Sequence, residues 1–169
     1  MYPLIYITRD IERALGLSLD TPGYFIIANW SPFANEIAGG RDNVLLIDGR
    51  RQLDTWELLE RSDVQKWIVE HGKTVLAFKP TKQIEQTCNA NGWHLLNPSA
   101  ELASKVEEKI TQLSFLAPIR SLFPPYSIST VSNIAWSGTP LIIQFNHSHT
   151  GSGTVLVKNG EDLNELKEK

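Results

Sequence analysis

The chain has 169 residues, a formal net charge of −3 at pH 7 and a hydrophobic fraction of 41%. These values are ordinary for a globular protein of one or two domains. The negative charge and the absence of a lysine and arginine cluster argue against a nucleic-acid partner. No secretory signal or bilayer-length apolar segment is visible, which argues against a membrane partner. Together with a single cysteine, Cys88, this predicts a cytoplasmic protein without an internal disulfide.

The first 98 residues alternate between predicted strands and helices. Apolar, β-branched runs predict strands at 4–8, 24–28, 44–48, 74–78 and 93–96. Helical patterns predict helices at 9–17, from Asp54, at 62–71 and at 81–91, whereas 29–33 is expected to be a loop. The strand at 44–48 is apolar without alternation from Val44 to Ile47, which is typical of a strand buried on both faces. The alternation predicts an α/β fold with a Rossmann-like, mostly parallel sheet and helices on both faces.

Ligand signals are sparse in this first part. No Gly-x-Gly-x-x-Gly follows the first strand, so the dinucleotide fingerprint is absent. Asp10 and Asp48 follow predicted strands, where open sheets bind ligands. Helix capping and loop solvation are the commoner roles of such carboxylates. Nothing here identifies a reaction.

The remaining residues predict a small α+β lobe. A helix is expected from Ser99 to about Leu116, with a buried face formed by Leu102, Val106, Ile110 and Leu113. A proline-containing loop and a strand at 126–130 follow. Two further strands, 140–144 and 154–158, flank a nine-residue loop, and a helix is expected at 160–169.

The loop at 145–153 carries the strongest ligand signal. Gly151 and Gly153 lack a Cβ, so their backbone N–H groups can approach an anion closely. Additional donors come from His147, Ser148, His149, Thr150 and Ser152. The loop therefore predicts a phosphate site. A solvated hairpin tip without a ligand is the alternative interpretation.

Several motifs in order resemble the first part of an ATP-grasp enzyme, as in biotin carboxylase and the large subunit of carbamoyl phosphate synthase. They are Asn97-Pro98, Lys109, a proline-containing loop, Pro140–Gln144, the glycine-rich loop, Val155–Val157 and Glu161–Leu163. The resemblance implies a Rossmann-like pre-ATP-grasp domain at 1–98. It also implies that 99–169 is a small lobe forming part of an ATP-grasp domain.

The resemblance also implies a set of nucleotide-binding residues. Lys109 matches the helix lysine that contacts ATP phosphate, and Thr150–Thr154 matches the loop that covers the phosphates. Gln144 stands where a strand-end lysine is usual, so it keeps hydrogen-bonding capacity without the charge. His147 and His149 could supply donors in its place. The complete candidate set is Lys109, Gln144, His147, His149, Thr150, Gly151, Ser152, Gly153 and Thr154, with no catalytic or metal-ligating residue assigned.

The implied function belongs to a whole ligase, which would activate a small-molecule carboxylate with ATP and Mg²⁺ through an acyl phosphate. In this family the Mg²⁺ ligands lie in a larger C-terminal lobe, and the sequence ends at Lys169 before such a lobe. We therefore expect a truncated or degenerate ligase front half with no turnover of its own. We also expect self-association, because the small lobe would expose apolar surface that the larger lobe normally covers. The alternative is a non-catalytic α/β binding or assembly module, which the glutamine at position 144 favours.

Overall fold

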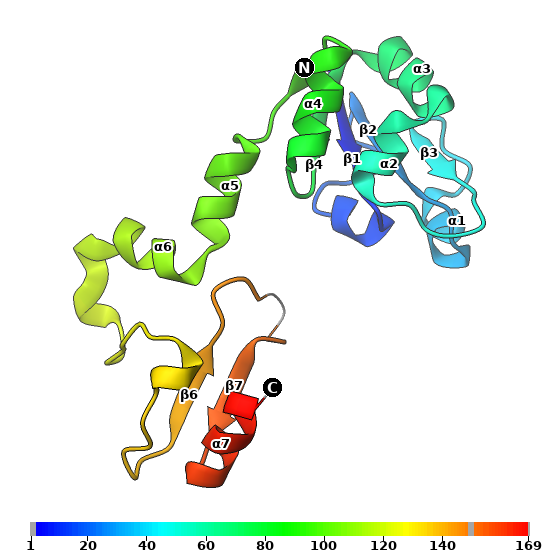
Figure 1. Cartoon of the computed structure of the whole chain (residues 1–169). Helices are drawn as coiled ribbons and strands as arrows, with labels where there is room; N and C mark the ends of the chain where they lie inside the picture. The colour runs from blue at the N-terminus through cyan, green and yellow to red at the C-terminus, as the bar shows by residue number, and fades with distance from the viewer. Residues whose placement is uncertain (1–2, 149–150, 169) are drawn as a thin grey trace. The chain divides into compact units, whose positions relative to one another are not determined.

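A computed structural model of the chain describes residues 3–148 and 151–168 (Figure 1). It divides into two compact units, Met1–Ala103 and Ser104–Lys169. The division lies within helix α5 (Ala100–Glu107). The assignment of a domain to 1–98 and a lobe to 99–169 stays a prediction. No helix among the described residues combines the length and apolarity needed to cross a bilayer.

The first unit is built on a five-stranded sheet. Its strands are β1 (Leu4–Ile7), β2 (Tyr24–Asn29), β3 (Val44–Ile47), β4 (Thr74–Ala77) and β5 (His94–Leu95), in the order β3-β2-β1-β4-β5. Every neighbouring pair is parallel. This order matches the first five strands of a doubly wound sheet. The predicted Rossmann-like α/β class is confirmed.

Helices cover both faces of this sheet. One face packs against α2 (Thr55–Glu60), α3 (Ser62–His71) and α4 (Lys82–Ala90), and the other against the 3-10 turn η1 (Ile11–Ala14) and helix α1 (Pro32–Ala38). Strand β2 shows why. Ile27 belongs to the first apolar cluster, while Ile26 and Ala28 belong to the second, because successive strand residues point to opposite faces. Cys88 is buried in the first cluster, and burial raises the pKa of its thiol to about 11.

Two elements of the first unit differ from the sequence-based expectation. The helix expected at 9–17 is only the turn η1. Its buried residues, Ile11 and Ala14, lie three positions apart, so a single 3-10 turn is enough to bury both side chains. The loop expected at 29–33 instead leads into α1. Ser31 Oγ accepts a hydrogen bond from Ala34 N at 3.0 Å, and Pro32 occupies the first helical position.

The second unit contains a two-stranded antiparallel sheet. β6 (Leu141–Gln144) pairs with β7 (Thr154–Val157), and helix α7 (Gly160–Glu168) follows. Ile143, Val157 and Leu163 form its apolar core, with Trp136 packed against them. The predicted hairpin and terminal helix are confirmed. The unit also contains α6 (Lys109–Phe115) and the 3-10 helices η2 (Ala117–Leu122) and η3 (Val131–Asn133).

The single helix expected at 99–116 is wrong. The helical segment breaks at Glu108 into α5 and α6. Side chains from α6 satisfy carbonyls at the break: Gln112 Nε2 donates to Val106 O at 2.8 Å, and Thr111 Oγ1 donates to Glu108 O at 3.0 Å.

The buried face predicted for that helix is also wrong, since Leu102, Val106 and Ile110 are 46%, 46% and 44% exposed. The strand predicted at 126–130 does not form either. Within the described residues, β6 and β7 pair only with each other.

Candidate functional site

The glycine-rich loop extends the β6–β7 hairpin beyond its last strand pair. Gln144 faces Thr154 in the register. Phe145 N then donates to Gly153 O at 2.8 Å, and Thr154 N donates to Gly151 O at 3.0 Å. Gly151 has a φ of +80°, in the left-handed region that a residue without a Cβ adopts readily. The described parts of the loop therefore have a hydrogen-bonded backbone.

Gly153 is required by close contact across the loop. It is buried, and a Cβ at this position would overlap Cβ and Oγ of Ser148. The same Cβ would lie 3.3 Å from Cβ of Phe145. The absence of a side chain at position 153 thus lets the two sides of the loop pack directly against each other.

Lys109, the first residue of α6, reaches this loop with its side chain. Its Nζ donates to Phe145 O at 3.0 Å, to Ser148 O at 2.7 Å and to Ser148 Oγ at 3.0 Å. An ammonium group has three donor hydrogens, so these oxygens can use all of them. The structure brings together the helix lysine and the glycine loop, which the sequence places 36 residues or more apart.

Asn146 connects the same loop to the main chain of α6, and sequence reasoning missed it. Its carbonyl oxygen accepts from Lys109 N at 3.4 Å, and its Oδ1 accepts from Ile110 N at 3.0 Å. Both N–H groups belong to the first turn of the helix, where no intrahelical acceptor exists. An asparagine in a loop is too common a signal to identify such a distant helix cap.

The other predicted residues of the loop are placed unevenly. Gln144 is exposed at the end of β6, and Ser152 is exposed in the loop. His147 is exposed, with its Nε2 3.2 Å from Asn146 Nδ2. His149 and Thr150 lie outside the described residues. Binding of nucleotide by the candidate set stays a prediction.

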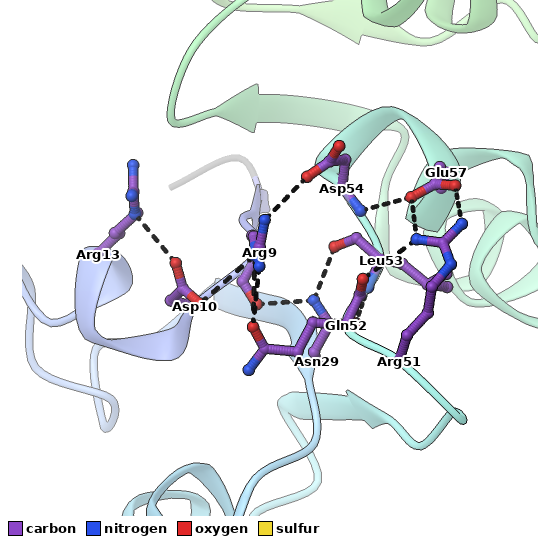
Figure 2. Close-up of polar contacts among 9 residues, drawn as sticks. All are labelled: Arg9, Asp10, Arg13, Asn29, Arg51, Gln52, Leu53, Asp54 and Glu57. Carbon is purple, nitrogen blue, oxygen red and sulfur yellow. Dashed lines mark hydrogen bonds and ion pairs between the residues drawn. The ribbon is translucent and has the colours of Figure 1, made fainter. Parts of the chain in front are cut away.

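A second polar cluster lies where the parallel strands of the first unit end (Figure 2). Asn29, at the end of β2, is 4% exposed. Its Nδ2 donates to Arg9 O at 2.8 Å and to Leu53 O at 2.9 Å, and its Oδ1 accepts from Leu53 N at 2.8 Å. One buried amide therefore joins the residues that follow β1 to the segment that follows β3.

The charged side chains around Asn29 are paired. Arg9 contacts Asp54 at 3.2 Å, and Arg13 contacts Asp10 at 3.4 Å. Arg51 Nη1 donates to Glu57 Oε2 at 2.9 Å. The three arginines and three carboxylates balance in charge, and Arg9 also donates to the amide oxygen of Gln52 at 3.3 Å. We interpret this edge as structural, because its charges neutralise one another.

Helix α2 begins within this cluster. Asp54 N donates to Glu57 Oε2 at 2.8 Å as part of a capping box, and the helix expected from Asp54 is confirmed. Arg51 and this backbone N–H together lower the pKa of Glu57 to about 2. Asp10, the strand-end carboxylate noted above, pairs with Arg13, and Asp48 is exposed. Within 3–148 and 151–168, no three His, Cys, Asp or Glu side chains form a group that could hold a metal ion.

Comparison with known proteins reveals similarity at the level of structure. No protein-family model and no curated protein matches the sequence. The biotin carboxylase domain of Hydrogenobacter thermophilus 2-oxoglutarate carboxylase, solved with MgADP, ADP and bicarbonate, is 15% identical, with a TM-score of 0.60. The match covers 99% of this chain and 40% of that domain.

Two N5-carboxyaminoimidazole synthetases give similar matches. The Staphylococcus aureus enzyme, solved with ADP, is 12% identical with a TM-score of 0.56, and the match covers 98% of this chain and 44% of that one. The Thermotoga maritima enzyme, an N5-carboxyaminoimidazole ribonucleotide synthetase, is 17% identical with a TM-score of 0.54, and the coverage is 98% and 43%.

The resemblance to ATP-grasp enzymes is therefore confirmed for the fold, because these neighbours belong to that superfamily. The chain spans about two fifths of their length.

Proposed function

We propose that Lys109 and the loop at 145–154 bind the phosphate groups of ATP, in the front part of an ATP-grasp ligase. The observation that carries this proposal is the position of the Lys109 ammonium against the glycine loop of the β6–β7 hairpin. A phosphate needs positive charge and N–H donors close together. The cationic side chain provides the charge, and the backbone N–H groups of Gly151–Gly153 provide donors.

The proposed chemistry is activation of a small-molecule carboxylate through an acyl phosphate. In phosphoryl transfer the protein contributes mainly positioning and stabilisation of the phosphate charge. In this chain Lys109 would neutralise phosphate oxygens, and Gln144 would offer a hydrogen bond near the nucleotide. The bicarbonate and ADP bound by the structurally similar biotin carboxylase domain of Hydrogenobacter thermophilus 2-oxoglutarate carboxylase support this substrate class. We assign the Mg²⁺ ligands of the whole ligase to a second lobe.

Three observations favour the alternative of a non-catalytic binding or assembly module. Gln144 lacks the charge of the usual lysine. The Lys109 ammonium already donates its hydrogen bonds to oxygens of the loop. Ile142 and Leu156, paired across the hairpin, are 65% and 53% exposed, and this apolar pair supports self-association. The two functions differ in whether the chain recognises phosphate.

Calorimetric titration of the 169-residue chain with Mg-ATP, and separately with adenosine, distinguishes these functions. We expect Mg-ATP to bind more tightly than adenosine, because the proposed contacts are to phosphate. The preference should diminish as salt rises, since exposed charges are screened. Equal affinity for both compounds, or no binding of Mg-ATP, would favour the non-catalytic module.

A further inference from the structure

Three protein oxygens surround the Lys109 ammonium. They are the carbonyl oxygens of Phe145 and Ser148 and the hydroxyl oxygen of Ser148, at 3.0, 2.7 and 3.0 Å. The terminal phosphate of a nucleotide also presents oxygens to a lysine. A phosphate that hydrogen-bonds to Lys109 must therefore replace at least one of these protein contacts.

The Ser148 hydroxyl is held firmly in this arrangement. Its Oγ donates to Phe145 O at 3.0 Å while accepting from Lys109. Phe145 is in turn bonded to Gly153 through its N–H group, and the missing Cβ at position 153 makes room for Ser148. These contacts form a connected network, in which each hydrogen bond supports the next.

The main chain of α6 is attached to the loop by separate contacts. Asn146 accepts hydrogen bonds from Lys109 N and Ile110 N, and neither bond involves the ammonium group. The Lys109 side chain can therefore leave the loop without releasing the start of the helix. The side-chain contacts act as a latch, and the Asn146 contacts act as a fixed anchor.

We propose that Ser148 latches Lys109 in a resting state, and that nucleotide phosphate releases the latch by taking over the ammonium. This inference rests on the proposed function, since it names the contact that phosphate displaces. Apparent affinity falls in proportion to the fraction of molecules that are binding-competent. The resting contacts consequently weaken nucleotide binding, and loosening them strengthens it.

Ser148→Ala tests this proposal, because alanine lacks the hydroxyl but leaves the residue's carbonyl in place. We expect the variant to bind Mg-ATP more tightly by about tenfold or more, which corresponds to the net contribution of one hydrogen bond to a charged group. Ser137→Ala is the matched control. Ser137 is exposed in the same unit, its Oγ lies 3.2 Å from Thr139 Oγ1, and its variant should bind like the parent chain. Unchanged or weaker binding by Ser148→Ala overturns the latch.

Lys109 ammonium signals in ¹H–¹⁵N NMR spectra separate failure of the latch from failure of the proposed function. Without nucleotide, we expect exchange of these protons with water to be slow in the parent chain and faster in Ser148→Ala. Equal exchange in both overturns the latch even if Mg-ATP binds. Slow exchange in the parent chain, with no Mg-ATP binding by either protein, overturns the proposed function and therefore the displacement of the latch by phosphate.

Discussion

Lys109→Met is expected to weaken Mg-ATP binding about tenfold or more. Methionine keeps an unbranched side chain of similar length but removes the charge and all three donors. Hydrogen bonds that involve a charged group contribute about 1.5–3 kcal/mol, and about 1.4 kcal/mol corresponds to a tenfold change in affinity. Loss of the latch offsets part of this effect, because Lys109 also contacts the loop. Calorimetry at fixed ionic strength measures the difference.

Lys167→Met is the control for net charge. Lys167 is exposed on α7, so its replacement changes the charge of the chain equally without touching the loop. We expect its affinity for Mg-ATP to remain close to that of the parent chain. If both variants weaken binding by the same factor, general charge rather than a contact with Lys109 is responsible.

Asn29→Ala is expected to lower the free energy of unfolding of the first unit by about 3 kcal/mol. The estimate assumes three lost hydrogen bonds at a net value of about 1 kcal/mol each. The bonds join Asn29 to Arg9 O, Leu53 O and Leu53 N, and the side chain is buried. Urea denaturation followed by tryptophan fluorescence provides the measurement. Four of the five tryptophans lie in Met1–Ala103, namely Trp30, Trp56, Trp67 and Trp93.

Asn91→Ala is the matched control for this stability measurement. Asn91 is exposed, and its Nδ2 donates to Thr87 O within the same helical region. Because water can replace that bond, we expect a loss below about 0.5 kcal/mol. A loss equally small for Asn29→Ala would show that its amide does not hold the strand ends together.

Local patterns were sufficient to predict most of the sheet in the first unit. Val44–Ile47 forms a strand within the continuous apolar run, and the alternation of strands with helices gave the doubly wound class. The break at Glu108 was not predictable from periodicity, because the apolar spacing continues through it. Thr111 and Gln112 satisfy carbonyls at the break through side-chain contacts, and a hydrophobic pattern carries no information about them.

The candidate site was predictable only in part. The glycine loop could be recognised from its composition, and the family resemblance singled out Lys109. The contacts of Lys109 with Ser148, and of Asn146 with the start of α6, connect residues 36 to 39 positions apart. The hydrogen bonds of Asn29 to Arg9 and Leu53 span 20 and 24 positions. Such pairings depend on how the chain folds back on itself, which a single sequence does not specify.

Amide chemical shifts recorded during a Mg-ATP titration of the ¹⁵N-labelled chain test the central claim most directly. We expect the largest changes at Lys109 and Ile110 and along the loop at 145–154, with small changes at strands β1 and β2 of the first unit. The proposed phosphate site would be contradicted by saturable changes centred on the first unit that leave Lys109 and the loop unaffected.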